Sequence, residues 1–166
     1  ALGIDCYYQD VVGDNEERMT QTIRTALGRS DLIFLSGGLG PTEDDLTKEV
    51  VCKVMEEPLV EDPHTRALIQ SYMESHLKSN PGSSITANNW KQALVPEHGI
   101  VLDNENGTAP GLIIEKNGKI AVLLPGPPIE MKPLFEEQVI PYLRGRQEDI
   151  LYSHMVKICG IGESAV

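Results

Sequence analysis

Short apolar runs and longer amphipathic stretches alternate along the 166 residues, and this alternation predicts strands and helices in turn. The runs rich in β-branched and aromatic residues, which predict strands, cover residues 4–12, 31–35, 99–102, 111–115 and 120–124. The run at 31–35 is short and bounded, which is typical of a buried parallel strand. We therefore expect an open, mainly parallel sheet that is covered by helices on both faces.

Apolar residues at helical spacing predict the helices between these strands. The first helix begins at Asp14, the expected N-cap, with Glu17 at the position of a capping box. The second helix follows a glycine-rich turn and ends near Pro58, and the third starts at Pro63, because proline is favoured at the first helical position. A mobile polar loop at 78–84, a short helix at 86–94, a hairpin turn at 116–118 and a last helix that ends near residue 143 complete the pattern.

The composition fits one soluble, cytoplasmic domain. The chain has 40% hydrophobic residues and a formal net charge of -11, and an acidic surface of this kind repels nucleic acid. Cys6, Cys52 and Cys159 are far apart in the sequence and are expected to be reduced thiols. The four histidines show no metal-ligand spacing, and no apolar run approaches the roughly 18 residues that cross a membrane. We expect residues 1–148 to form the domain without its first strand and helix, and residues 149–166 to form a linker and the start of another domain.

The candidate site lies where the strand at 31–35 meets the next helix. Gly37, Gly38 and Gly40 let the main chain turn sharply and come close to a ligand. Ser36 and Thr42, on the same turn, are further expected ligand contacts. Thr42 with Asp45 three positions later resembles a capping box, which predicts a helix start at this point. A strand, a glycine turn and a helix N-terminus together favour an anion site for phosphate or pyrophosphate.

Two carboxylates, Asp44 and Asp45, lie on the same turn. A carboxylate repels a bound phosphate unless a divalent metal lies between them or the carboxylate accepts a hydrogen bond from the ligand. The alternative is that both only favour the positive end of the helix dipole, at roughly 0.3–1 kcal/mol each. The turn alone therefore predicts a site and no reaction.

Asp14 and the proline-rich segment 125–130 also follow strand ends and are expected on the same rim, because ligands of open α/β sheets bind beyond the carboxyl ends of the strands. The prolines of segment 125–130 have a purely structural alternative. The loop 106–111, between two predicted strands, is rich in turn-forming and small residues. Lys91, in the short helix, either reaches an anionic ligand or belongs to a solvated face. From these segments the expected ligand-contacting residues are Lys91, Asn106, Gly107, Thr108, Pro125, Gly126, Pro127 and Glu130.

Several segments taken in order resemble the N-terminal domain of the CinA (competence/damage-inducible) family. They read SGGLGPTEDDLTKE at 36–49, NWKQALVP at 89–96, NGTAPG at 106–111, LPGPPIEMK at 124–132 and GIGES at 160–164. The resemblance covers nearly the whole chain and extends to the wider molybdopterin-binding MoaB/Mog superfamily. It implies a three-layer α/β/α fold in which Asp14 and Asp45 line the ligand pocket.

The resemblance also implies an activity, which is hydrolysis of ADP-ribose or a similar nucleotide at its pyrophosphate. This activity needs a divalent metal (magnesium, manganese or cobalt), and potassium assists it. Asp45 and Asp44 are then the expected metal ligands, Asp14 and Glu130 the candidate base or supporting groups, and the amides of Gly37, Gly38 and Gly40 the phosphate donors. Two alternatives remain open: a pocket that holds molybdopterin or a pterin phosphate without hydrolysis, and a vestigial pocket in a domain that serves assembly. The expected partners are a phosphorylated small molecule and further copies of the chain, as a dimer or trimer.

Overall fold

The computed structural model describes residues 2–79 and 87–146. Residues 80–84 of the loop predicted at 78–84 and the predicted linker at 149–166 lie outside the described residues, and the first two residues of that loop belong to a helix. The elements in chain order are α1 (Glu16–Arg29), β1 (Leu32–Ser36), α2 (Thr47–Val54), β2 (Leu59–Glu61), α3 (Pro63–Ser79), the 3-10 helix η1 (Ala87–Ala93), β3 (Leu94–Pro96), β4 (Ile100–Leu102), β5 (Gly111–Lys116), β6 (Lys119–Leu124), α4 (Pro128–Pro133), the π-helical turn η2 (Leu134–Val139) and α5 (Ile140–Arg144).

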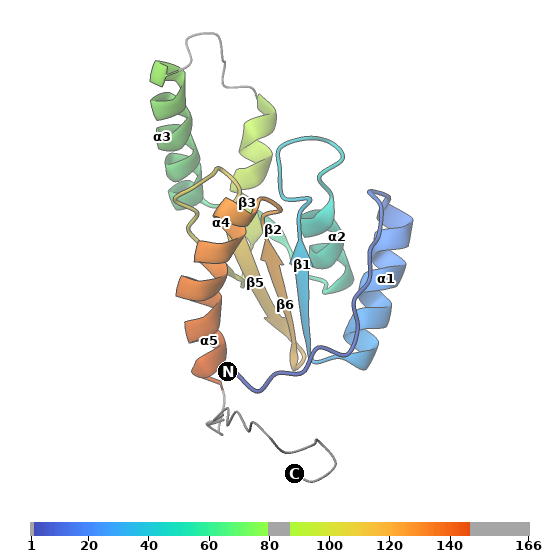
Figure 1. Ribbon diagram of the computed structural model, residues 1–166. Helices are drawn as coiled ribbons and strands as arrows, with labels where there is room; N and C mark the ends of the chain where they lie inside the picture. The colour runs from blue at the N-terminus through green and yellow to red at the C-terminus, as the bar shows by residue number, and fades with distance from the viewer. Residues whose placement is uncertain (1, 80–86, 147–166) are drawn as a thin grey trace, which may run out of the picture.

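The main sheet has the strand order β1-β6-β5-β4 (Figure 1). Strands β1 and β6 are parallel, whereas β5 is antiparallel to both β6 and β4. The expectation of a mainly parallel sheet is therefore wrong for the described residues. The reason is the two-residue turn between β5 and β6, in which Asn117 and Gly118 have φ values of 52° and 73°. Two positive φ angles in succession form a tight hairpin, and a hairpin joins antiparallel strands.

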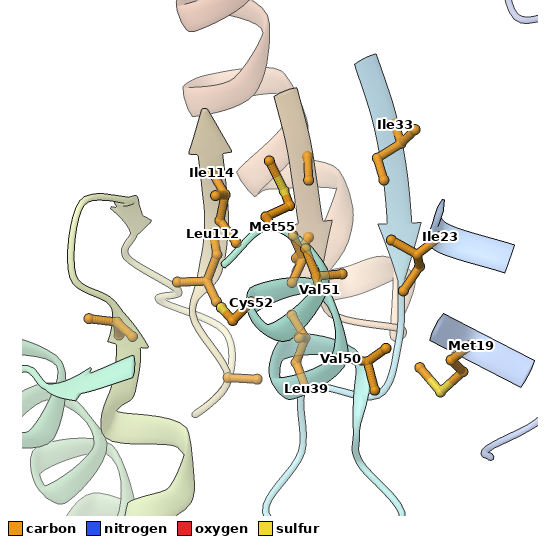
Figure 2. Packing of buried hydrophobic residues seen from close by; sticks show 14 residues of the cluster. Met19, Ile23, Ile33, Leu39, Val50, Val51, Cys52, Met55, Leu112 and Ile114 are labelled. Carbon is orange, nitrogen blue, oxygen red and sulfur yellow. The ribbon is translucent and has the colours of Figure 1, made fainter. Parts of the chain in front are cut away.

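The three-layer architecture is confirmed. One face of the sheet packs against α1 and α2, through Met19, Ile23, Val50, Val51 and Cys52. The other face packs against the helical segment that runs from α4 to α5 (Figure 1). Alternate residues of β5 and β6 enter the two cores, so these strands are buried on both faces. Figure 2 shows the α2 side chains in contact with the sheet residues of the first core.

The predicted strand at 4–12 is absent, and this segment forms an exposed stretch without regular structure. Its pattern is β-like, but no described strand pairs with it, and a strand without a ladder partner is not stable. Arg29 holds the segment against α1: its guanidinium lies 3.7 Å from the Tyr8 ring centroid and donates to Asp10 at 2.5 Å. The predicted N-cap is also displaced by one residue, because Asn15, and not Asp14, accepts the Arg18 N–H at 3.0 Å.

A second, two-stranded antiparallel sheet pairs β2 with β3. The sequence analysis missed it, because each strand has three residues and β3 ends in a proline, which argues against a strand. The helix expected at 86–94 is the 3-10 helix η1, which packs against α3. Helices α3 and η1 lie near the end of the sheet at which β1 and β6 end (Figure 1).

Candidate functional site

One cavity of about 420 Å³ lies beyond the carboxyl ends of β1 and β6. Three segments form most of its wall: the glycine turn after β1, the loop before β5, and the turn after β6 with the start of α4. Tyr72 of α3 and Gln92 of η1 complete it. The lining residues are Gly37, Gly38, Leu39, Gly40, Pro41, Asp45, Tyr72, Gln92, Asn106, Gly107, Thr108, Ala109, Pro125, Gly126, Pro127 and Glu130. The structure thus brings together the glycine turn and segment 125–130, which the sequence analysis assigned to one rim, and adds the loop before β5; Asp14, assigned to the same rim, is not in the wall.

The glycine turn is shaped by positions that only glycine fits without strain. Gly37 and Gly38 have φ values of 90° and 67°, and a Cβ on Gly38 would lie 2.2 Å from Thr47 Oγ1. The turn is fixed at both ends, because the Gly37 N–H donates to the Leu124 carbonyl at 2.9 Å and the Thr47 N–H donates to the Gly38 carbonyl at 3.1 Å. The Gly37 N–H is therefore bonded to the end of β6 and is not available to a phosphate, contrary to the prediction.

Asp45 faces the cavity, and its carboxylate accepts hydrogen bonds from another residue of the same loop. Its Oδ2 accepts from the Thr42 N–H at 3.0 Å and from Thr42 Oγ1 at 2.6 Å. Burial acts to raise the pKa of Asp45, but the two Thr42 bonds, the Gly40 N–H and nearby Lys91 outweigh it, so the pKa lies below its ordinary value. Asp45 is therefore ionised at neutral pH. The Thr42–Asp45 pair closes a turn, and the predicted helix start is wrong: α2 begins at Thr47.

Two amides of the turn remain available. Within the residues that the structure describes, the N–H groups of Gly38 and Leu39 have no acceptor. Both residues line the cavity. Consecutive main-chain donors in a glycine-rich turn form a concave anion site. The amides that the turn leaves available are thus those of Gly38 and Leu39, whereas the prediction named Gly37, Gly38 and Gly40.

Lys91 supports the turn from behind and does not line the cavity. Its ammonium donates to the Thr42 carbonyl at 2.9 Å and to the Asp45 carbonyl, and it lies 3.7 Å from Glu49. Lys48 in turn donates to the Lys91 carbonyl at 2.7 Å. Burial lowers the pKa of Lys48. The predicted contact of Lys91 with an anionic ligand is replaced by contacts that fix the loop bearing Asp45.

The opposite wall is organised by Asn104, which the sequence analysis did not select. Its Nδ2 donates to Glu130 Oε2 at 2.7 Å and to the Ala109 carbonyl at 2.8 Å. A Cβ on Gly107 would meet the same Glu130 oxygen, so a side chain at this position would displace the Glu130 carboxylate. The Tyr72 hydroxyl donates to the Asn106 carbonyl at 3.3 Å, which ties α3 to this loop.

Five predicted site residues lie outside the cavity wall, namely Asp14, Ser36, Thr42, Asp44 and Lys91. Asp14 lies in the exposed segment before α1, because no described strand brings that segment to the sheet edge. Asp44 is exposed on the outside of its turn. The cavity residues that were missed are Leu39, Pro41, Tyr72, Gln92 and Ala109.

A divalent cation fits this site only with help from its ligand. Among the described residues, no group of three His, Cys, Asp or Glu side chains is placed to hold a metal. Thr42 uses only Oδ2 of the Asp45 carboxylate, and the Gly40 N–H also acts on this carboxylate, so a cation would share it with the loop. Magnesium in phosphate-binding sites is commonly held by one or two carboxylates, substrate phosphates and water. The donor set is compatible with that arrangement, with Asp45 as the protein ligand and Asp44 outside it.

Comparisons with known proteins show the class of the domain. A family model described as "Probable molybdopterin binding domain" matches residues 1–145, so the chain carries a domain of the molybdopterin-binding class. A solved structure of CinA from Thermoplasma acidophilum is 35% identical, with a TM-score of 0.63, and the match covers 77% of this chain and 72% of that one. The chain therefore belongs to the CinA family of competence-damage inducible proteins.

The curated relatives that the chain matches are longer than the chain itself. Proteins named competence-damage inducible protein from Clostridium beijerinckii and Caldicellulosiruptor saccharolyticus are 52% and 48% identical over 166 residues. These matches cover all of this chain and 39% of each relative, so the chain spans about two fifths of their length. Within the described part of this chain, none of the helices has the length and apolar character needed to cross a bilayer.

Proposed function

We propose that the cavity binds ADP-ribose or a similar nucleotide and hydrolyses its pyrophosphate bond with the help of a divalent metal. The observation that carries this proposal is the position of two unpaired amides, those of Gly38 and Leu39, beside the ionised carboxylate of Asp45 in one cavity. The amides suit phosphate oxygens. A carboxylate beside a phosphate is favourable when a cation lies between them.

Hydrolysis of ADP-ribose adds one water across a phosphorus–oxygen bond and gives AMP and ribose 5-phosphate. The amides of Gly38 and Leu39 bind and orient the diphosphate, and the glycines leave room for its close approach. Asp45 would hold the metal, which supplies charge neutralisation and a more acidic bound water. Glu130, held by Asn104 on the opposite wall, is the candidate group to accept the proton of the attacking water.

The test is a product assay on the full-length protein with ADP-ribose and magnesium, manganese or cobalt, with AMP release followed by chromatography. We expect Asp45→Asn to lower turnover by at least about 100-fold, because the variant keeps the side-chain shape and loses the charge that holds the metal. Asp31→Asn is the matched control: Asp31 precedes β1, at the end of the strand opposite the cavity, and is exposed. Wild-type rates in Asp45→Asn would remove Asp45 from the mechanism.

A second candidate function is binding of molybdopterin or a related pterin phosphate without hydrolysis. The description of the matching family model favours it. In this case Asp45 accepts a hydrogen bond from the ligand, and no metal is required. Titration with both ligands separates the two candidates: tight binding of molybdopterin, with no AMP released from ADP-ribose in any of the three metals, favours the second.

A further inference from the structure

Asn104 holds one carboxylate oxygen of Glu130 in the cavity wall. The orientation of the Asn104 amide follows from the main chain of its own loop, because Oδ1 accepts the Asn106 N–H at 3.0 Å and Nδ2 donates to the Ala109 carbonyl at 2.8 Å. A main-chain N–H can only donate and a carbonyl can only accept, so the amide cannot be turned over. Its second N–H then donates to Glu130 Oε2 at 2.7 Å.

The two oxygens of the Glu130 carboxylate therefore differ. Oε2 is bonded to Asn104 and lies at the place that a Cβ on Gly107 would take. Oε1 makes no hydrogen bond to the residues that the structure describes. Among those residues the buried side-chain atoms without a partner are Glu49 Oε2 and Gln92 Oε1, so Glu130 Oε1 is not buried. Since Glu130 lines the cavity, Oε1 is the oxygen that water or a ligand can reach.

The main chain of Glu130 is fixed as well, in the first turn of α4, where its N–H donates to the Pro127 carbonyl at 3.0 Å. A glutamate side chain has several rotatable bonds, and holding it in one orientation costs up to about 2 kcal/mol of conformational entropy. The hydrogen bond from Asn104 fixes the far end of this side chain before any ligand binds. Such preorganisation matters for a reacting group, because a misplacement of about 1 Å can cost about 100-fold in rate.

We propose that Asn104 is a positioning residue, which by occupying Oε2 directs Oε1 of Glu130 to the water that attacks the diphosphate. The inference rests on the proposed function, in which Glu130 accepts a proton. In that step an O–H bond of the water breaks and the proton goes to Oε1, while the water oxygen forms a bond to phosphorus. The bridging oxygen leaves with the electron pair of the broken phosphorus–oxygen bond. Asn104 keeps its hydrogen bonds and takes up no proton.

Two variants separate this role from simple support of the loop. Asn104→Ala removes all the bonds of the side chain. Asn104→Asp keeps an acceptor for the Asn106 N–H but places a second carboxylate against Glu130. If Asn104 only supported the loop, Asn104→Asp would be the milder change. If it acts through Glu130, Asn104→Asp is at least as harmful, because two adjacent carboxylates repel each other and hold a proton between them.

The experiment measures steady-state AMP release from ADP-ribose by the full-length protein with magnesium. We expect both Asn104 variants to lower kcat at least tenfold with KM changed less than about twofold. Glu130→Gln should keep a residual rate, because a general base supplies only about 10²–10⁴-fold. In the Glu130→Gln background, Asn104→Ala should lower kcat less than about twofold further, since the group through which it acts is gone.

Asn117→Asp is the matched control. It makes the same replacement in the hairpin between β5 and β6, at the end of β6 opposite the cavity, and should keep wild-type kcat and KM. Crystals of Asn104→Asp without ligand or metal give a readout that needs no activity: the Glu130 carboxylate should leave its place against Gly107. If Asn104→Ala fails to fold, which far-UV circular dichroism would show, Asn104→Asp with its retained loop bond completes the test.

Several results would overturn the inference and leave hydrolysis standing. They are wild-type kcat in Glu130→Gln or in Asn104→Asp, losses confined to KM, equal effects of Asn104→Ala in both backgrounds, and an unmoved Glu130 carboxylate in the Asn104→Asp crystals. No AMP release by the wild type with magnesium, manganese or cobalt would refute the proposed function, and this inference with it.

Discussion

Replacement of Gly38 by alanine tests whether the glycine turn is shaped as the structure has it. The new methyl group would lie 2.2 Å from Thr47 Oγ1 and 3.1 Å from Thr47 Cβ, at a backbone φ of 67°. A left-handed conformation costs an L-residue about 1–2 kcal/mol, and overpacking costs a further 1–3 kcal/mol or so. We therefore expect a loss of about 3 kcal/mol in the free energy of unfolding, or about 6–12 °C in Tm for a domain of this size.

Gly37→Ala is the matched control, because it separates the backbone cost from the clash. Gly37 has a φ of 90°, but no atom lies within 4 Å of the position that its Cβ would take. Only the backbone cost remains, so we expect a loss of about 1–2 kcal/mol. Adding Thr47→Ala to Gly38→Ala removes the nearest atom and should recover part of the difference.

Urea unfolding, followed by far-UV circular dichroism and by the fluorescence of the single tryptophan, measures all four proteins. The order of midpoints should be wild type, Gly37→Ala, the double variant and Gly38→Ala. If Gly38→Ala were no less stable than Gly37→Ala, or if the Thr47 change brought no recovery, the contact between the turn and α2 would be wrong.

Three further predictions concern groups around the site. Because the pKa of Asp45 is lowered in the folded state, its contribution to stability is present above pH about 4 and is lost as the pH falls through the folded pKa. Thr42→Val removes a hydrogen bond that lowers this pKa, so it should weaken the loss of stability in acid, measured by urea titrations between pH 3 and 7. Lys91→Met removes the bonds to two carbonyls of the turn and should lower the unfolding free energy by about 1–3 kcal/mol, and an unchanged urea midpoint would contradict that role. Burial raises the pKa of the Cys52 thiol to about 12, so peptide mapping after a thiol reagent at pH 8 should find exposed Cys6 modified and Cys52 unmodified until the protein unfolds.

Local signals predicted the parts of the fold that depend on local chemistry. The hairpin at Asn117 and Gly118 is fixed by two residues that tolerate positive φ, and the start of α3 by Asp62 and Pro63, where Asp62 accepts the Thr65 N–H at 2.7 Å. The pairing of strands is not local. The segment 4–12 has a strand pattern, but its state depends on a partner strand that no pattern within the segment can supply.

In the candidate site, too, some residues were predicted from local sequence signals and others were not. The glycine turn and Asp45 were found because strand, glycines and acidic residues are adjacent in sequence. Gln92 and Lys91 are neighbours in a short polar stretch with no such signal, and the structure gives them different contacts: Gln92 donates to the Leu39 carbonyl, and Lys91 donates to the Thr42 and Asp45 carbonyls. On a 3-10 helix, consecutive residues point about 120° apart, so a stretch that predicts one solvated face can bury two different groups. That geometry places two separate supports of the glycine turn on one short element, and a substitution at either position should therefore loosen the turn at a different point.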